Sequence, residues 1–297
     1  MLELLERRIK SCAARDGVPR DVVEKDYAIG HVLAAIYRHP LLRDRLVFKG
    51  GTALRKAHFA DYRFSEDLDF SALPGRDEFE PLIRDVAEGA ERTLLEQGSF
   101  SVSVSRYPTR DPHPGGQEAF RLHVRFPWQS RALCSLKLEI TTDEPVLVEP
   151  LRLPLSHGYD EKLECTLCCN ALDEVVAEKL RALLQTRARL SERGWARPRS
   201  RDYYDLWQLL SARQGVVSIE DAARLLPAKC VVRDVGFAAP QDFFDNSVLQ
   251  RARLDWRESL GRMVIDLPDF DDCLRDLRVP VEMLVEFALA TGRGGCA

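Results

Sequence analysis

The sequence lacks any long hydrophobic run. No stretch approaches the ~20 consecutive apolar residues that a membrane-spanning helix needs, and the N-terminus begins as a charged amphipathic segment rather than as a signal peptide. An excess of one charge is also missing, because 43 basic and 47 acidic residues leave a net charge of −4. Any contact with nucleic acid would therefore need a local basic patch. These absences predict a cytoplasmic protein with no membrane partner.

A zinc-finger pattern is missing as well. Cys165 and Cys168 form one CxxC pair, followed directly by Cys169, but no second CxxC or His pair follows at zinc-finger spacing. Reduced, mostly buried thiols are the favoured interpretation of the eight cysteines, and zinc binding is the alternative. No internal repeat is present, and 297 residues are enough for one or two domains with a sizeable core.

A strand, a glycine turn and a helix are predicted in succession at residues 46–56, which read Leu-Val-Phe-Lys-Gly-Gly-Thr-Ala-Leu-Arg-Lys. The apolar strand runs into Gly50 and Gly51, and the helix begins near Thr52. Free backbone N–H groups and the helix dipole favour phosphate at such a turn. Alone, a pair of glycines is more often a simple turn.

Two carboxylates follow on a second predicted strand, residues 63–70, which read Arg-Phe-Ser-Glu-Asp-Leu-Asp-Phe. Residues two apart on a strand project from the same face, so Asp67 and Asp69 point together while Leu68 and Phe70 point into a core. Mg²⁺ typically binds through one or two carboxylates plus substrate phosphates. Together with the glycine turn, this pattern predicts a nucleoside triphosphate site.

Further strands are indicated by alternating apolar and polar residues in three segments: 99–105, 120–126 and 135–140. In the last segment Leu136 and Leu138 face inward, so Glu139 faces the opposite side. Glu139 is therefore a candidate third carboxylate. A solvated strand residue is the alternative.

Two helices are predicted near residues 171–184 and 200–212. Lys179 falls inside the apolar stripe of the first, where a lysine must find an anion or extend past its neighbours to water. Asp202 shares a face with apolar residues of the second helix, and Asp205 lies at the edge of that face. Lys179 is the expected partner of Asp202, whose alternative role is to cap the helix.

An almost single-signed charge run joins these helices. Glu192 alone opposes seven arginines, namely Arg181, Arg187, Arg189, Arg193, Arg197, Arg199 and Arg201. Most charge runs are simply solvated, but one of this length also suits a polyanion such as RNA.

These motifs resemble the nucleotidyltransferase superfamily, and more closely the AbiEii/AbiGii type of toxin from type IV toxin–antitoxin systems. The resembling segments are residues 48–56, 63–70, 177–182 and 201–206. The family's usual Gly-Ser pair is Gly51-Thr52 here, which keeps the hydroxyl.

The resemblance implies an α+β fold, with a nucleotidyltransferase-like mixed sheet flanked by helices and then a helical C-terminal domain. A proline-rich stretch, residues 145–158, predicts the crossing between a catalytic domain, 1–155, and a helical domain, 156–297. The implied activity is transfer of a nucleotide from a nucleoside triphosphate (NTP) to an RNA such as a tRNA 3′ end. A cognate antitoxin is implied to neutralise this activity.

Site roles follow from the resemblance. Asp67 and Asp69, with Glu139, would hold one or two Mg²⁺ ions. Gly50, Gly51 and Thr52 would hold the triphosphate, and Ser65 would donate to a phosphate oxygen. Lys179 would contact phosphate. Asp202 would orient that lysine or activate the acceptor, with Asp205 as the second choice for this role. Lys56 and Arg63 would contact phosphate or form surface salt bridges.

Two other functions remain open. One is a transferase of the same fold whose acceptor is a protein or small-molecule hydroxyl. The other is a non-catalytic protein that binds an NTP and releases no pyrophosphate.

Overall fold

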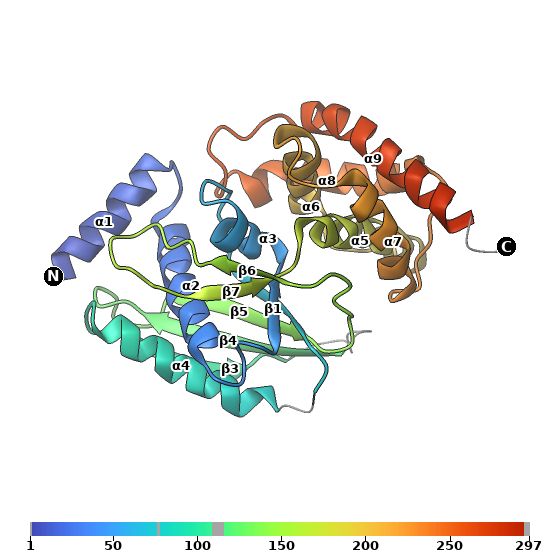
Figure 1. Cartoon of the computed structure of the whole chain (residues 1–297). Coiled ribbons are helices and arrows are strands. Elements are labelled where there is room, and N and C mark those ends of the chain that lie inside the picture. Colours follow the sequence, from blue (N-terminus) through green and yellow to red (C-terminus); the bar gives the residue numbers. More distant parts are fainter. Residues whose placement is uncertain (1, 76–77, 109–115, 294–297) are drawn as a thin grey trace. The chain divides into compact units, whose positions relative to one another are not determined.

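A seven-stranded mixed sheet forms the centre of the first of two structural units (Figure 1). The computed structural model describes residues 2–75, 78–108 and 116–293, and its units are Met1–Asn170 and Ala171–Ala297. The strands are β1 (Leu46–Lys49), β2 (Asp67–Ala72), β3 (Ser101–Arg106), β4 (Gln117–Arg125), β5 (Cys134–Thr141), β6 (Leu151–Pro154) and β7 (Thr166–Cys169).

The strand order is β3-β4-β5-β2-β1-β7-β6. β2 pairs in parallel with β5, and β1 in parallel with β7, while the other pairs are antiparallel. The helical elements of this unit are α1 (Leu2–Arg15), α2 (Arg20–Arg38), α3 (Gly50–Ala53), the π-helix η1 (Leu54–His58) and α4 (Phe79–Leu95).

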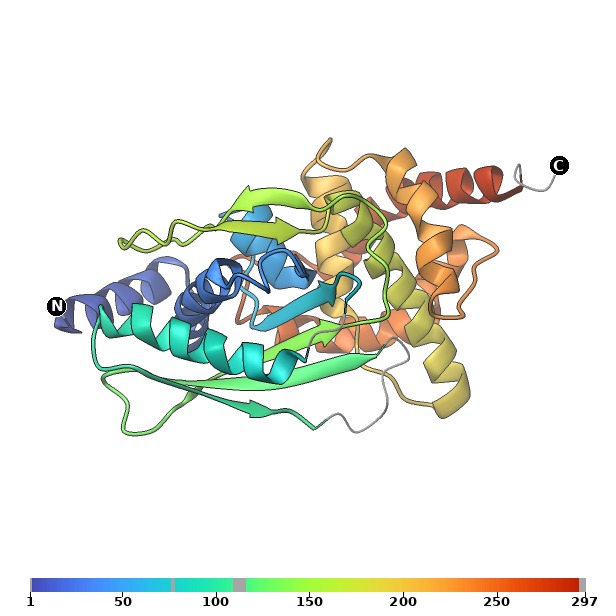
Figure 2. The same ribbon diagram turned by 60° about the horizontal axis from the view of Figure 1, so that its bottom comes forward.

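One face of the central strands is apolar. α2 and α4 lie side by side over the sheet (Figures 1 and 2), and Leu68, Phe70 and Leu138 are fully buried. Their neighbours Asp67, Asp69 and Glu139 are only half-buried. The period-two patterning therefore predicted correctly which residues of β2 and β5 face the core.

The sheet extends beyond the domain boundary expected from the sequence. β7 lies beside β1, with Phe48 opposite Cys169, and β6 pairs with β7. Residue 155 consequently falls in the connection between two strands of the sheet. Both strands are four residues long, too short to show a clear alternation of polar and apolar residues.

The second unit consists of helices: α5 (Leu172–Arg193), α6 (Ser200–Trp207), the π-helix η2 (Gln208–Ala212), α7 (Ile219–Val231), the 3₁₀ helix η3 (Pro240–Phe244), α8 (Asn246–Leu260) and α9 (Phe270–Arg293). Its interior includes an aromatic cluster in which Phe270 makes edge contacts with Tyr203 and Trp256. A mixed sheet with flanking helices and a helical C-terminal part confirms the expected fold class.

The cysteines within the described ranges are free thiols, and five of them are buried: Cys134, Cys168, Cys169, Cys230 and Cys273. Burial raises the pKa of each of these five. Within the described ranges, no helix is both long and apolar enough to cross a bilayer.

An internal ion cluster joins α5 to α7. The Lys229 ammonium lies 2.5 Å from Glu174 and 2.9 Å from Glu178, and Lys229 and Glu174 are fully buried. Both carboxylates raise the pKa of Lys229 against the opposing effect of its burial. The cluster therefore stabilises the folded state only while both signs of charge are present.

We expect Lys229→Ala to lower the free energy of unfolding by about 3–5 kcal/mol, because Glu174 would lose its buried countercharge. Urea denaturation measures this loss. Arg275→Ala is the matched control, since its ion pairs with Asp272 and Asp276 are exposed and should contribute less than about 1 kcal/mol. Equal losses in the two variants would contradict the assigned role of Lys229.

Candidate active site

The two aspartates of β2 lie on the half-buried, polar face of the sheet. Asp67 is opposite Lys137 and Asp69 is opposite Glu139 on the neighbouring parallel strand β5. Residues in register on adjacent strands project from the same face. The register thus brings together the three carboxylates that the sequence analysis singled out.

The glycine turn meets this face where β1 ends. Gly50 has φ = 76°, a left-handed conformation that costs any L-residue about 1–2 kcal/mol. A Cβ atom on Gly50 would lie 2.6 Å from Asp69 Oδ2. The turn therefore requires glycine both for its backbone conformation and for the close approach of Asp69.

Gly51 brings two further predicted residues to the turn. A Cβ atom on Gly51 would lie 2.5 Å from Arg63 Nη2 and 3.2 Å from Ser65 Oγ. Arg63 and Ser65 are both buried, so Arg63 is not a surface salt-bridge residue. A guanidinium, a hydroxyl and the backbone of the turn thus lie within a few ångströms of one another.

Thr52 anchors the turn to the acid-bearing strand. Its hydroxyl donates to the backbone carbonyl of Asp67 at 2.5 Å, and the residue is buried. The Thr52 side chain therefore joins α3 to β2, which leaves its backbone N–H as the group suited to an anion.

Glu139 is held by two neighbours. Its carboxylate lies 2.8 Å from the Lys137 ammonium and accepts a hydrogen bond from the side-chain amide of Gln117. It is thus not a simply solvated residue. Its role as a metal ligand stays a prediction.

The electrostatic effect of the site's charges and burial is seen in the pKa of Asp69. Loss of solvation, followed by the charges of Asp67 and Glu139, raises the pKa of Asp69 to about 7. Lys49 and Lys137 act in the opposite direction. Their positive charges only partly balance the carboxylates.

Lys49 is a residue that the sequence analysis passed over. It lies opposite Asp69 on β1, is buried, and its ammonium is 3.4 Å from Glu144. Its place directly before the two glycines was the available signal, because a lysine that ends an otherwise apolar strand needs an acidic partner.

These residues fit a divalent cation. Two aspartates on one face, with a third acid in register beside them, are the oxygen ligands that Mg²⁺ prefers. The charges of Asp67 and Glu139 act on the pKa of Asp69 more strongly than those of Lys49 and Lys137, so negative charge is left for a cation to neutralise.

Lys56, a predicted phosphate contact, lies in the protein interior. It is 1% exposed, and its ammonium is 2.8 Å from Asp26 of α2. Arg55 and Tyr159 bind the same carboxylate, at 2.9 and 3.1 Å. Lys56 thereby fastens the helix that follows the glycine turn onto α2.

The second unit contains the expected lysine–aspartate cluster. Lys179 Nζ lies 3.0 Å from Asp202 and 2.7 Å from Asp205. Arg199 also contacts Asp202, at 3.3 Å. The predicted pairing of Lys179 with Asp202 is confirmed, and Arg199 rather than Asp202 is the N-cap residue of α6.

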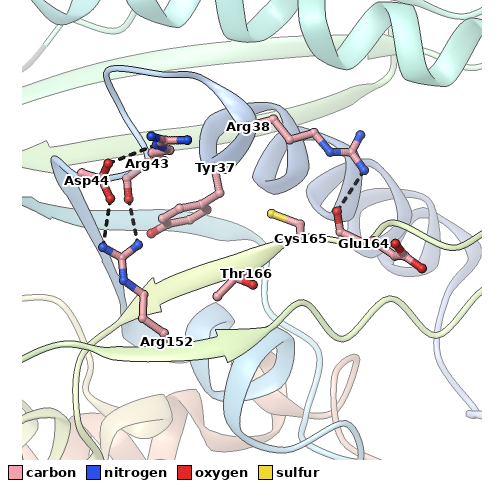
Figure 3. A pocket seen from close by; sticks show the side chains of 8 residues that line it. All are labelled: Tyr37, Arg38, Arg43, Asp44, Arg152, Glu164, Cys165 and Thr166. Atoms are coloured by element: carbon pink, nitrogen blue, oxygen red, sulfur yellow. Dashed lines mark hydrogen bonds and ion pairs between the residues drawn. The ribbon is translucent and has the colours of Figure 1, made fainter.

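A surface pocket in the first unit is lined by none of these residues. Figure 3 shows its lining: Tyr37, Arg38, Arg43, Asp44, Arg152, Glu164, Cys165 and Thr166. Arg152 binds Asp44 at 3.0 Å, and Arg38 donates to the Glu164 carbonyl at 3.1 Å. With these arginines already bound to protein acceptors, we assign the pocket no ligand.

A glycine turn beside an acid-bearing strand, in a mixed sheet followed by helices, is the arrangement of the nucleotidyltransferase class. The family model for the nucleotidyl transferase AbiEii toxin of type IV toxin–antitoxin systems matches residues 31–276, and the chain belongs to this family. Membership confirms the resemblance found in the sequence.

Among solved structures, the chain is similar to MenT4, a nucleotidyltransferase toxin from Mycobacterium tuberculosis H37Rv. The match has a TM-score of 0.63 and 21% identity, and covers 98% of this chain and 95% of that chain. At this identity the likeness shows a shared fold. Curated protein sequences gave no match.

The pKa of Asp69 predicts the pH dependence of stability. The carboxyl ionises near 3.8 in its ordinary state and near 7 in the fold, so the folded protein holds an extra proton between these values. The contribution of Asp69 to the free energy of unfolding therefore falls as pH rises from about 4 to 7. We expect metal-free Asp69→Asn to be more stable than the natural protein by about 1–3 kcal/mol at about pH 8.

Thermal unfolding in chelator at about pH 4 and about pH 8 measures this difference, which should vanish at the lower pH. Asp85→Asn is the control, since Asp85 is 61% exposed and its change should be small at both pH values. If the metal-free Asp69→Asn protein is less stable than the natural one at about pH 8, the ionised Asp69 carboxylate does not destabilise the fold, which would contradict the prediction.

Proposed function

We propose that the protein is a Mg²⁺-dependent nucleotidyltransferase that moves a nucleotide from an NTP to an RNA hydroxyl, such as a tRNA 3′ end, and that a cognate antitoxin neutralises it. The observation that carries this proposal is the placement of Asp67 and Asp69 on one face of β2, with Asp69 against Gly50 of the turn. Family membership supports the transferase class.

The chain's own groups would perform the positioning. Backbone N–H groups of the turn bind phosphate oxygens, and the Arg63 guanidinium and Ser65 hydroxyl lie beside them. Asp67 and Asp69, with Glu139, would hold one or two Mg²⁺ ions, which would neutralise charge at the phosphates. The acceptor hydroxyl attacks the α-phosphorus in line, and the new P–O bond replaces the bond to pyrophosphate.

An RNA acceptor is supported by the end of α5. The helix stops at Gly194, which has φ = 68°, and the chain then presents Trp195 with 66% exposure. Arg193 and Arg197, on either side, are exposed as well. An exposed aromatic ring between arginines is suited to stacking a base of single-stranded RNA while binding its phosphates. We call these three residues the Trp195 patch.

The other arginines of the run differ in their surroundings. Arg181 is buried, Arg187 pairs with Asp242, and Arg199 binds Thr186 and Asp202. Arg189 and Arg201 are half-buried. The exposed positive charge of the run is therefore concentrated in the Trp195 patch. The contact that we propose between this run and RNA is accordingly small.

Lys179 and Asp202 are proposed to assist the same reaction. Lys179 lies between two carboxylates, Asp202 and Asp205, which balance its charge and hold its ammonium in a fixed orientation. Asp202 is 18% exposed and Asp205 fully buried. Asp202 is thus the better candidate for a group that meets an acceptor.

The direct test of the activity is incubation with each labelled NTP, Mg²⁺ and total RNA. We expect label to enter tRNA with the natural protein and to fall at least about 100-fold in Asp67→Asn/Asp69→Asn, because the cation loses both aspartate ligands. Asp85→Asn/Asp160→Asn serves as an equal change of two exposed carboxylates. Equal labelling by all three proteins would refute the assigned site.

Removal of the two arginines of the Trp195 patch tests the acceptor. We expect Arg193→Ala/Arg197→Ala to weaken RNA binding and to reduce the slope of log affinity against log salt by about 1.4, since each lost phosphate contact to single-stranded RNA contributes about 0.7. Filter binding over a salt series measures the slope.

The matched control is Arg257→Ala/Arg275→Ala, which removes two exposed arginines elsewhere in the second unit and should leave the slope unchanged. Full RNA labelling by the patch variant would refute the role of the Trp195 patch. Pyrophosphate release by the natural protein with no label entering RNA would favour a protein or small-molecule acceptor. Triphosphate binding without pyrophosphate release in the natural protein would favour a non-catalytic role.

A further inference from the structure

A second cluster of ligand-type side chains lies in the first unit, apart from the acids of β2. His31 belongs to α2, while His157 and Glu161 belong to the connection between β6 and β7. In Figures 1 and 2 this yellow-green connection leaves the strands on the side of α2. The side chains of His31 and His157 are 1% and 3% exposed, and that of Glu161 is 12% exposed.

The three side chains converge on one point. His157 Nε2 lies 3.2 Å from Glu161 Oε1, and His31 Nε2 lies 3.5 Å from the same oxygen. One ligand atom from each residue can be chosen so that all lie within 4.8 Å of one another. A single ion could therefore contact all three after small side-chain movements.

The hydrogen bond to Thr93 favours the tautomer of His31 that carries its proton on Nδ1. The Thr93 hydroxyl donates to the Ala90 carbonyl at 3.0 Å, so its oxygen accepts from His31 Nδ1–H, also at 3.0 Å. A neutral ring with its proton on Nδ1 leaves Nε2 unprotonated. Nε2 then carries a lone pair that faces a carboxylate oxygen, an arrangement that a cation between the two atoms would stabilise.

The fold makes room for the His157 ring at a cost to α2. Gly30 lies in the middle of that helix, where glycine is about 1 kcal/mol less favourable than alanine. A Cβ atom on Gly30 would lie 2.2 Å from His157 Nδ1. The glycine thus allows the ring to lie against the helix beside His31.

The ligand set indicates the kind of ion. Two imidazole nitrogens and one carboxylate oxygen suit zinc and related first-row transition ions, whereas Mg²⁺ prefers oxygen ligands alone. We propose that His31, His157 and Glu161 bind one divalent transition ion of the zinc type, which fixes the β6–β7 connection onto α2.

This position connects the ion to the glycine turn. Tyr159 of the same connection donates to Asp26 of α2 at 3.1 Å, and Asp26 holds Lys56 and Arg55 of the helix that follows the turn. An ion that immobilises the connection thereby supports the segment on which the phosphate-binding turn depends. The role is structural, and it does not require the transferase activity.

The test is zinc binding by tag-free, full-length protein after removal of metal with a chelator. We expect one zinc per chain by elemental analysis, and competition with a chromophoric chelator gives the affinity. His31→Gln, His157→Gln and Glu161→Gln should each weaken binding at least about 100-fold, and Thr93→Val should weaken it about 10-fold through His31. Circular dichroism checks that each variant is folded, and Thr93→Val preserves side-chain shape if a histidine variant does not fold.

Three controls separate this site from others. His123→Gln changes a histidine of β4, Asp67→Asn/Asp69→Asn changes the β2 acids, and Cys165→Ser/Cys168→Ser removes the CxxC pair. All three should bind zinc as the natural protein does, and a cobalt-substituted protein should show no thiolate charge-transfer band. Absence of zinc binding at micromolar concentration, or binding that survives in the histidine variants and is lost in the cysteine variant, would overturn the proposal.

Discussion

Repulsion between carboxylates held on one face of a sheet is the constraint on which this structure depends. Asp67 and Asp69 share a face of β2, and Glu139 lies in register beside Asp69. Loss of solvation, together with the charges of Asp67 and Glu139, disfavours ionisation of Asp69 and raises its pKa to about 7. Without a cation the arrangement opposes folding, so its presence in an otherwise well-packed sheet indicates a functional site.

The surrounding structure holds the acids in this arrangement. The apolar face of β2 is fixed by Leu68 and Phe70, and the Thr52 hydroxyl joins α3 to the backbone of the same strand. Gly50 permits the approach of the turn to Asp69. The buried contacts of Asp26 join the helix that follows the turn to α2. The proposed zinc-type ion would further fix the β6–β7 connection onto α2.

Local patterning was sufficient to predict the acid-bearing strand. The alternation of polar and apolar residues on β2 and β5 predicted that Asp69 and Glu139 face away from the core. The position of Lys179 in the apolar stripe of α5 predicted its pairing with Asp202. These inferences hold because strand and helix periodicity fix which side chains share a face. Packing then decided only the distances.

Contacts between distant segments could not be read in the same way. Lys56 was predicted to contact phosphate or to form a surface salt bridge, yet its buried ammonium binds Asp26, which only tertiary packing brings close. The strands β6 and β7 are too short to carry a periodic signal. His31 and His157 are far apart in the chain, so no spacing rule for metal ligands could have joined them.

The most direct test of the central claim is a crystal structure of the protein with Mn²⁺ and a non-hydrolysable NTP analogue. Anomalous scattering identifies the metal independently of the protein atoms. We expect a peak between Asp67 and Asp69, with the phosphates of the analogue against Gly50 and Gly51. A metal bound elsewhere while these carboxylates contact only protein, or phosphates bound away from the turn, would contradict the account.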